Sequence, residues 1–155
     1  MKISSKFLLS LQKVLLMPRV VRDIMTKCVV TIDANGTALE AAKLMAEKGI
    51  SSLIVLNNEN PVGIVTERDF VKKICIKELQ VSHVKVNEFM SKIRTFADPE
   101  TPIDVAVQRM VNHKIRRLPI MENGKVVGII TVTDLAKHLR TTLLIEGVLS
   151  GNSDS

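Results

Sequence analysis

The stretches "PVGIVTERD" (residues 61–69) and "VVGIITVTD" (residues 126–134) share one pattern. In both, an apolar run with an embedded glycine ends in a threonine, and an aspartate follows three residues later. Short runs rich in β-branched residues are typical of buried strands. The glycine lacks a side chain just before the strand end, so another backbone or a flat ligand can come close, and a pocket floor is one use of this space.

The two stretches belong to a longer internal repeat with a constant offset of 65 residues and no gap. The matched pairs include Met25 and Met90, Ile50 and Ile115, Leu53 and Leu118, Gly63 and Gly128, and Asp69 and Asp134. A unit of about 55 residues buries little surface alone. We therefore expect the two copies to pack sheet to sheet as one domain.

Each copy contains the apolar spacing of an amphipathic helix. The apolar positions are Ala38, Ala41, Ala42, Met45 and Ala46 in the first copy, and Ile103, Ala106, Val107, Met110 and Val111 in the second. Thr37 with Glu40 is a typical helix start, and Gly49 is a typical stop. In the second copy, Thr101 before Pro102, with Asp104, indicates the start.

Two strands and a second helix are expected after each of these helices. The segments "NNEN" (57–60) and "ENG" (122–124) separate β-branched runs, which predicts two hairpins. The short strand before the helix is "VVTI" (29–32) in one copy and "RTFA" (94–97) in the other. The predicted fold is therefore α+β (α/β), with two tandem β-α-β-β-α repeats.

The segment before Pro18 has no counterpart in the repeat. Its residues Ile3, Phe7, Leu11, Val14 and Leu15 share one face of a helix. This helix is either a membrane-surface or partner-binding element, or a lid or dimer seam, which is the simpler interpretation. The predicted organisation is this helix (1–18), repeat 1 (19–76), a connector (77–87), repeat 2 (88–144) and a C-terminal tail (145–155) that is disordered at its end, "SGNSDS".

Composition limits the partners and the compartment. The 155 residues are 46% apolar and 25% charged, without an apolar run long enough for a membrane span. Gln12 and Lys13 interrupt the N-terminal apolar stretch and no cleavage site follows, so we expect a cytoplasmic protein. The net charge of +6 favours anionic partners, while the lack of Trp and Tyr argues against nucleic acid that stacks on aromatic rings.

No catalytic or metal-binding pattern is visible. Cys28 and Cys75 have neither disulfide nor metal-ligand spacing, so we expect two reduced, half-buried thiols. His83, His113 and His138 lack zinc spacing. No nucleophile stands beside an identifiable base, and the repeated carboxylates occur one per copy. These patterns predict a protein that is not an enzyme and requires no metal or cofactor.

The polar residues at the strand ends have two interpretations. Thr66 and Thr131 can offer a hydroxyl and an amide to a phosphate, and Asp69 and Asp134 can accept hydrogen bonds from ribose hydroxyls. Alternatively, these residues simply cap the following helices. Both interpretations fit a duplicated pattern.

Basic residues distinguish the two copies. Arg116 and Arg117 begin a strand in the second copy, and Arg117 is the better candidate to clamp a phosphate. The first copy has Ser51 and Ser52 there, with Arg68 as compensation, so its phosphate contacts should be poorer. We therefore expect the second copy to provide the stronger cleft.

From about Val20 to Leu139 the chain resembles a free-standing CBS-domain pair, or Bateman module. The resemblance lies in "VRDIM" and "VNEFM", in "GISSLIV" and "KIRRLPI", and above all in "GIVTERD" and "GIITVTD". It implies two repeats around a pseudo-twofold axis, with two related clefts between them. It also implies a homodimer that forms through the helices.

The resemblance further implies ligands and residue roles. Similar modules bind AMP, ADP or ATP, sometimes S-adenosyl compounds or dinucleotides, and regulate rather than catalyse. By position, Asp134 and Asp69 would hold ribose, and Thr131, Thr133 and Thr66 would lie near ribose and phosphate. Arg117 would contact phosphate, and Arg116 replaces a histidine of the family pattern. Adenine would lie against Ile115 and Ile129, or against Ile50 and Ile64, with contacts to its edge near Cys28 and Ile93.

Two other functions stay open beside a nucleotide sensor that signals to a partner protein or through its own dimer. One is an interaction or dimerisation module with vestigial clefts, which Ser51 and Ser52 in the weaker copy favour. The other is nucleic-acid binding through the basic surface, which the scarcity of aromatic residues makes the weaker alternative.

Overall fold

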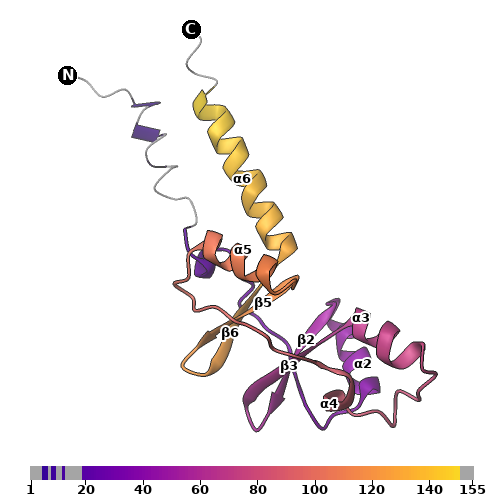
Figure 1. Cartoon of the computed structure of the whole chain (residues 1–155). Helices are drawn as coiled ribbons and strands as arrows, with labels where there is room; N and C mark the ends of the chain where they lie inside the picture. Colours follow the sequence, from indigo (N-terminus) through magenta and orange to yellow (C-terminus); the bar gives the residue numbers. More distant parts are fainter. Residues whose placement is uncertain (1–4, 7, 10–11, 13–18, 151–155) are drawn as a thin grey trace.

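The computed structural model describes residues 5–6, 8–9, 12 and 19–150 (Figure 1). The apolar face predicted for the N-terminal helix, from Ile3 to Leu15, lies outside these residues, although the described positions 5–6, 8–9 and 12 are helical. No helix in the described part of the chain is long and apolar enough to cross a membrane.

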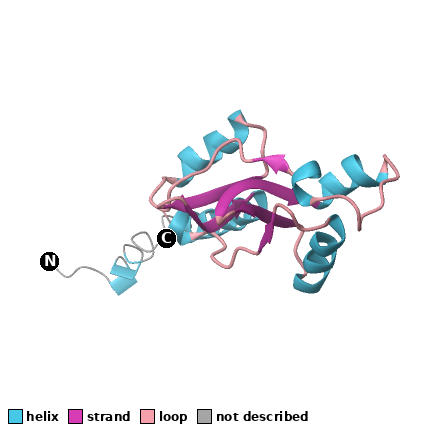
Figure 2. Cartoon of the chain, turned by 90° about the horizontal axis from the view of Figure 1, so that it is seen from below, coloured by secondary structure: helices cyan, strands magenta, loops and turns pink. Residues whose placement is uncertain are grey.

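The first half of the chain contains most of one repeat. Its elements are η1 (Val21–Asp23), β1 (Thr31–Asp33), α2 (Ala38–Lys48), β2 (Ser52–Asn57), β3 (Asn60–Thr66), α3 (Glu67–Asp69) and the π-helical turn η2 (Phe70–Cys75). The second half contains α4 (Val86–Phe89), β4 (Ser91–Lys92), α5 (Ile103–Asn112), β5 (Arg117–Glu122), β6 (Lys125–Thr131) and α6 (Val132–Ser150). The expected α+β class is confirmed, and Figure 2 shows the strands in the middle with helices around them.

The strands form two sheets. The order in the first is β1-β2-β3-β4, with β1 parallel to β2 and the other neighbours antiparallel. The second consists of the hairpin β5-β6, and β6 contacts β3 of the first sheet. Both hairpins turn on two residues with positive φ, Asn58 with Glu59 and Asn123 with Gly124, which matches the twist of a hairpin.

The short strands differ from the prediction. In place of "RTFA", only Ala97 forms an isolated bridge, to Ile120. The strand β4 lies just before this segment and pairs with β3 of the first copy. Thr26, the equivalent of Ser91, makes the matching bridge to Ile129.

The segments 20–26 and 85–91, called the exchanged segments below, therefore each pack against the other copy. Val21 lies in the core of the second copy, with Leu118, Ile120 and Ile130. Val86 and Phe89 lie in the core of the first copy. Sequence periodicity indicates that a segment is apolar, but it does not indicate which sheet covers it.

The repeated glycines receive these exchanged segments. A Cβ atom at Gly128 would clash with the Met25 side chain, and one at Gly63 would clash with Met90. The expectation that something approaches closely there holds, but a thioether occupies the space and the glycines do not line a pocket floor. A flexible methionine fits such an irregular gap well.

The cap predicted at the start of α2 is confirmed, whereas the one predicted at Thr101 for α5 is wrong. Thr37 Oγ1 accepts a hydrogen bond from the Glu40 amide at 3.2 Å, Glu40 accepts one from the Thr37 amide at 2.7 Å, and Gly49 ends α2 with φ 63°. In the second copy Thr101 does not cap α5, because Pro102 takes the N-cap position and the Thr101 hydroxyl accepts from the Asp98 amide.

Helix α6 continues beyond the predicted end of repeat 2. It reaches Ser150 and projects beyond the rest of the fold in Figure 1. Residues 140–150 contain no proline, and five of these eleven residues are Leu, Ile or Val, so no proline ends the helix there. The helix therefore continues through part of the segment predicted as the C-terminal tail.

Candidate functional site: two related clefts

Two cavities lie between the copies at pseudo-symmetric positions. Cleft 1 has a volume of about 670 Å³ and is lined by Thr26, Cys28, Val29, Val30, Ala42, Met45, Ala46, Gly49, Ile50, Ser51, Ser52, Ile54, Glu67, Phe70, Arg117, Ile129, Thr131 and Thr133. Cleft 2 has a volume of about 450 Å³ and is lined by Ile64, Thr66, Arg68, Asp69, Lys72, Lys73, Ser91, Lys92, Ile93, Arg94, Thr95, Lys114, Ile115, Arg116, Arg117 and Pro119. Both sizes suit a small organic ligand.

The copies contribute to each cleft in a different combination from the one expected. Ile50 lines cleft 1 together with Ile129, and Ile115 lines cleft 2 together with Ile64. The expected pairs, Ile115 with Ile129 and Ile50 with Ile64, are therefore wrong. Each cleft takes the strand-end residues of one copy and the residues after the first helix of the other.

This combination also relocates the arginines. Arg116 lines cleft 2 beside Thr66 and Asp69 of the first copy, and Arg117 lines both clefts. The expectation that the first-copy motif depends on Arg68 alone is wrong, because the crossed arrangement brings it the arginines of the second copy. Arg68 lines cleft 2 as well.

Asp69 is held by four hydrogen bonds in the wall of cleft 2. Its Oδ2 accepts from the Thr66 amide and hydroxyl, both at 2.9 Å, and its Oδ1 accepts from Ser91 Oγ at 3.0 Å and Lys73 Nζ at 2.9 Å. Only 7% of the residue is exposed. Burial raises the pKa of Asp69, but the hydrogen bonds from Lys73, Thr66 and Ser91 outweigh it and lower the pKa.

Asp134 makes only the first part of this network. Its Oδ2 accepts from the Thr131 amide at 2.8 Å and the Thr131 hydroxyl at 2.7 Å. Its Oδ1 accepts no hydrogen bond from the described residues. Thr131 and Thr133 line cleft 1, whereas Asp134 is not among the residues that line it. Both aspartates therefore fix the start of a helix, as the capping interpretation predicts, and each also orients the threonine beside its cleft.

Arg117 lies at the junction of the two clefts. Its Nη2 donates a hydrogen bond to Ser51 Oγ at 2.8 Å. It also lines a third cavity of about 280 Å³, which contains Thr66, Thr131 and Thr133 from the two strand ends. Burial and the neighbouring Arg116 lower the pKa of Arg117, while Glu67 and Asp69 raise it. Arg117 is thus a basic residue that both clefts share.

Sequence reasoning missed five basic residues of cleft 2: Lys72, Lys73, Lys92, Arg94 and Lys114. A signal was visible at the offset of 65, where Arg94 and Lys114 replace Val29 and Gly49. Elsewhere, Cys28 and Cys75 are free and exposed, in contrast to the half-buried thiols expected. No three His, Cys, Asp or Glu side chains gather as a metal site within the described residues.

Comparison with known families decides the identity of the repeats. The CBS domain matches residues 21–75 and 86–141, which cover the two copies. The chain belongs to the CBS-domain family. CBS domains are regulatory modules, and the match does not indicate an enzyme family.

Individual relatives align with about three quarters of this chain. The chain is 36% identical over 117 residues to an uncharacterized protein of Methanopyrus kandleri, and the alignment covers 74% of this chain and 60% of the relative. It is 34% identical to the CBS domain-containing protein YhcV of Bacillus subtilis, covering 75% of this chain and 82% of YhcV. The chain thus spans less than two thirds of the first of these relatives.

Solved CBS pairs share the fold. The CBS domain pair of protein MJ0100, in complex with 5′-methylthioadenosine and S-adenosylmethionine, is 26% identical and superposes with a TM-score of 0.72. The superposition covers 81% of this chain and 99% of that structure. The tandem arrangement expected from the repeat is therefore confirmed.

Proposed function

We propose that this CBS pair is a regulatory sensor that binds adenine nucleotides, such as AMP, ADP or ATP, or a related adenosine compound, between its repeats. The observation that carries the proposal is the duplicated cleft geometry. Each cleft places an apolar wall from one copy opposite a strand-end threonine from the other, with Arg117 within reach. An apolar wall suits a base, and hydroxyl and guanidinium groups suit ribose and phosphate.

The relative with bound adenosine compounds supports this ligand class. The site residues proposed are those expected from the sequence, now divided between the clefts. Cys28, Ile50, Ser51, Ile129, Thr131 and Thr133 would serve cleft 1, with Asp134 positioning Thr131; Ile64, Thr66, Arg68, Asp69, Ile93, Ile115 and Arg116 would serve cleft 2; and Arg117 would serve both.

The signal would arise because every ligand touches both copies. A ligand that fits one arrangement of the copies better shifts the population toward it, by no more than its difference in affinity. The readout would be a change in how the copies sit, or in a homodimer, that a partner protein recognises. We expect the sensor to act in the cytoplasm.

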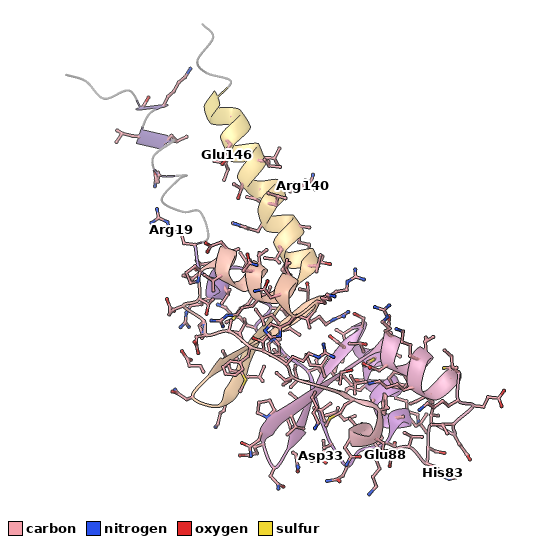
Figure 3. The ribbon with its side chains drawn as sticks, viewed as in Figure 1. Arg19, Asp33, His83, Glu88, Arg140 and Glu146 are labelled. Carbon is pink, nitrogen blue, oxygen red and sulfur yellow. The ribbon has the colours of Figure 1, made fainter. Side chains whose placement is uncertain are left out.

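Calorimetric titration with AMP, ATP and S-adenosylmethionine tests the proposal. Arg117→Ala removes a donor that both clefts share, so we expect micromolar binding by the wild type and at least about tenfold weaker binding by the variant. Arg140→Ala is the matched control, because Arg140 lies on α6 and lines neither cleft (Figure 3). We expect the Arg140→Ala variant to bind each ligand with the affinity of the wild type.

A structural module with unused clefts is the second candidate. It is favoured by the internal pairing of cleft groups, since Ser51 is bonded to Arg117 and Asp69 accepts four hydrogen bonds. Failure of all three ligands to bind a folded wild type that still associates into dimers would select it over the sensor.

A further inference from the structure

The two clefts differ sharply in charge. Eight basic residues and one acidic residue line cleft 2, whereas Arg117 and Glu67 are the only charged residues that line cleft 1 among the described residues. The whole chain has a net charge of only +6. The positive charge of the molecule is therefore concentrated in one of two otherwise related clefts.

Most of this charge is uncompensated. Lys73 pairs with Asp69 at 2.9 Å. No ion pair within the described residues involves the other cleft-lining cations Arg68, Lys72, Lys92, Arg94, Lys114 and Arg116. Like charges repel when they gather in a concave surface with low-dielectric walls, and the same geometry focuses the field on an incoming anion. An anionic ligand would relieve this repulsion.

The backbone at Lys114 supports the same interpretation. Lys114 has φ 51°, in the left-handed region that is unfavourable for an L-residue with a Cβ atom. Its equivalent in the first copy is Gly49, with φ 63°, which adopts this conformation without that cost. The second copy thus has a strained lysine where the first has glycine, and this lysine lines cleft 2.

Cleft 1 has the opposite character. Its wall includes Val29, Val30, Met45, Ile54 and Phe70, and its polar groups are mostly hydroxyls. The equivalents of its Val29, Ser51 and Thr133 in cleft 2 are Arg94, Arg116 and Arg68. Such a cleft favours ligands with little charge, since few cations are present to replace the hydration of several phosphates.

We infer that the two clefts take different ligand classes: cleft 2 binds a polyphosphate, as in a nucleoside di- or triphosphate, and cleft 1 binds a nucleoside compound with little net negative charge. The nucleoside part of this inference rests on the proposed function. The polyphosphate part rests on charge alone, so inorganic tripolyphosphate probes it without a nucleoside.

Calorimetric titrations with adenosine, ATP and sodium tripolyphosphate, each at low and high salt, test the division. Arg94→Glu reverses a charge in cleft 2, and Arg140→Glu is the matched reversal on α6, away from both clefts (Figure 3). We expect Arg94→Glu to lower the affinity for ATP and for tripolyphosphate about tenfold or more, because charge-assisted hydrogen bonds are stronger than neutral ones. High salt should also lower the affinity for both ligands, because it screens exposed charges.

Adenosine provides the contrast. Its affinity should be the same in the wild type and both variants, and nearly independent of salt. Lys114→Gly offers a second variant that relieves backbone strain, so weaker tripolyphosphate binding there cannot be attributed to unfolding. The control Arg140→Glu should leave all three affinities unchanged.

Each other outcome has a distinct meaning. Equal, salt-independent affinities for adenosine and ATP would overturn the division but leave the proposed function intact. Binding of tripolyphosphate without adenosine or ATP would overturn the proposed function and the assignment of cleft 1, and support the assignment of cleft 2. Absence of tripolyphosphate binding, or equal losses in Arg94→Glu and Arg140→Glu, would overturn the assignment of cleft 2.

Discussion

The first and second copies share a backbone plan but hold their equivalent residues differently. Asp69 accepts four hydrogen bonds, including one from Lys73, whereas its equivalent Asp134 is bonded by Thr131 alone. The atoms nearest to a Cβ at Gly63 belong to Met90 and the Ser91 carbonyl, whereas the three nearest at Gly128 all belong to the Met25 side chain. Duplication therefore preserves where elements lie, while the side chains around each strand end have diverged in strength and charge.

The largest effect should come from filling the glycine sites. Gly63→Ala and Gly128→Ala each place a Cβ against a methionine, and we expect losses of about 1–3 kcal/mol in the free energy of unfolding. The Gly63 variant should lose more, because the Ser91 carbonyl also lies 3.0 Å from the new atom and belongs to the paired strand β4. Urea denaturation measures both.

Double variants sharpen this comparison. Met25→Ala removes the three nearest atoms at Gly128, so the double variant should be markedly more stable than the sum of the single losses predicts. Met90→Ala leaves the Ser91 carbonyl in place, so it should rescue Gly63→Ala less. Additive losses in both pairs would contradict the contacts.

Removal of the aspartates should have a smaller effect. Asp69→Ala removes the acceptor of the Thr66 amide and of two hydroxyls, and it removes the ion pair of Lys73, so we expect a loss of about 2 kcal/mol. Asp134→Ala removes only a helix-start contact, worth about 1 kcal/mol. Equal losses, measured by chemical denaturation, would show that the extra bonds of Asp69 contribute nothing.

Exchange of the residues that end the first helices should act in opposite directions. Lys114→Gly relieves a positive φ and should raise the free energy of unfolding by roughly 1 kcal/mol. Gly49→Lys introduces the same conformation to a lysine and should lower it by a similar amount. Thermal unfolding measures both changes. A change in stability in the same direction for both variants would show that the backbone conformations at these positions differ from those described.

The smallest effect concerns acid. The pKa of Asp69 is lowered from an ordinary value of 3.8, so its ionised form is favoured in the folded state. The stability that it contributes is present above the unfolded pKa and is lost as the pH falls through the folded pKa. Between about pH 5 and pH 2 the wild type should therefore lose more stability than Asp69→Asn. Parallel losses would contradict the lowered pKa.

The constant offset of 65 predicted the repeated helices and hairpins, because local signals such as Thr37, Glu40 and Gly49 suffice for them. It did not predict the exchanged segments, since the apolar pattern around Met25 and Met90 is the same whichever sheet covers it. The pairing of Ile50 with Ile129 is a consequence of that three-dimensional exchange. The charge of cleft 2 was visible only in part, at Arg94 and Lys114, because its cations come from both copies and only the fold brings them together.

The exchanged segments have a consequence for folding. Each copy obtains part of its core from the other, Val21 for the second and Phe89 for the first. A fragment with only one copy would leave one side of its sheet uncovered and expose the apolar residues of its own segment. The two copies should therefore unfold in a single cooperative transition, and their folding must wait for contacts between positions as distant as Thr26 and Ile129.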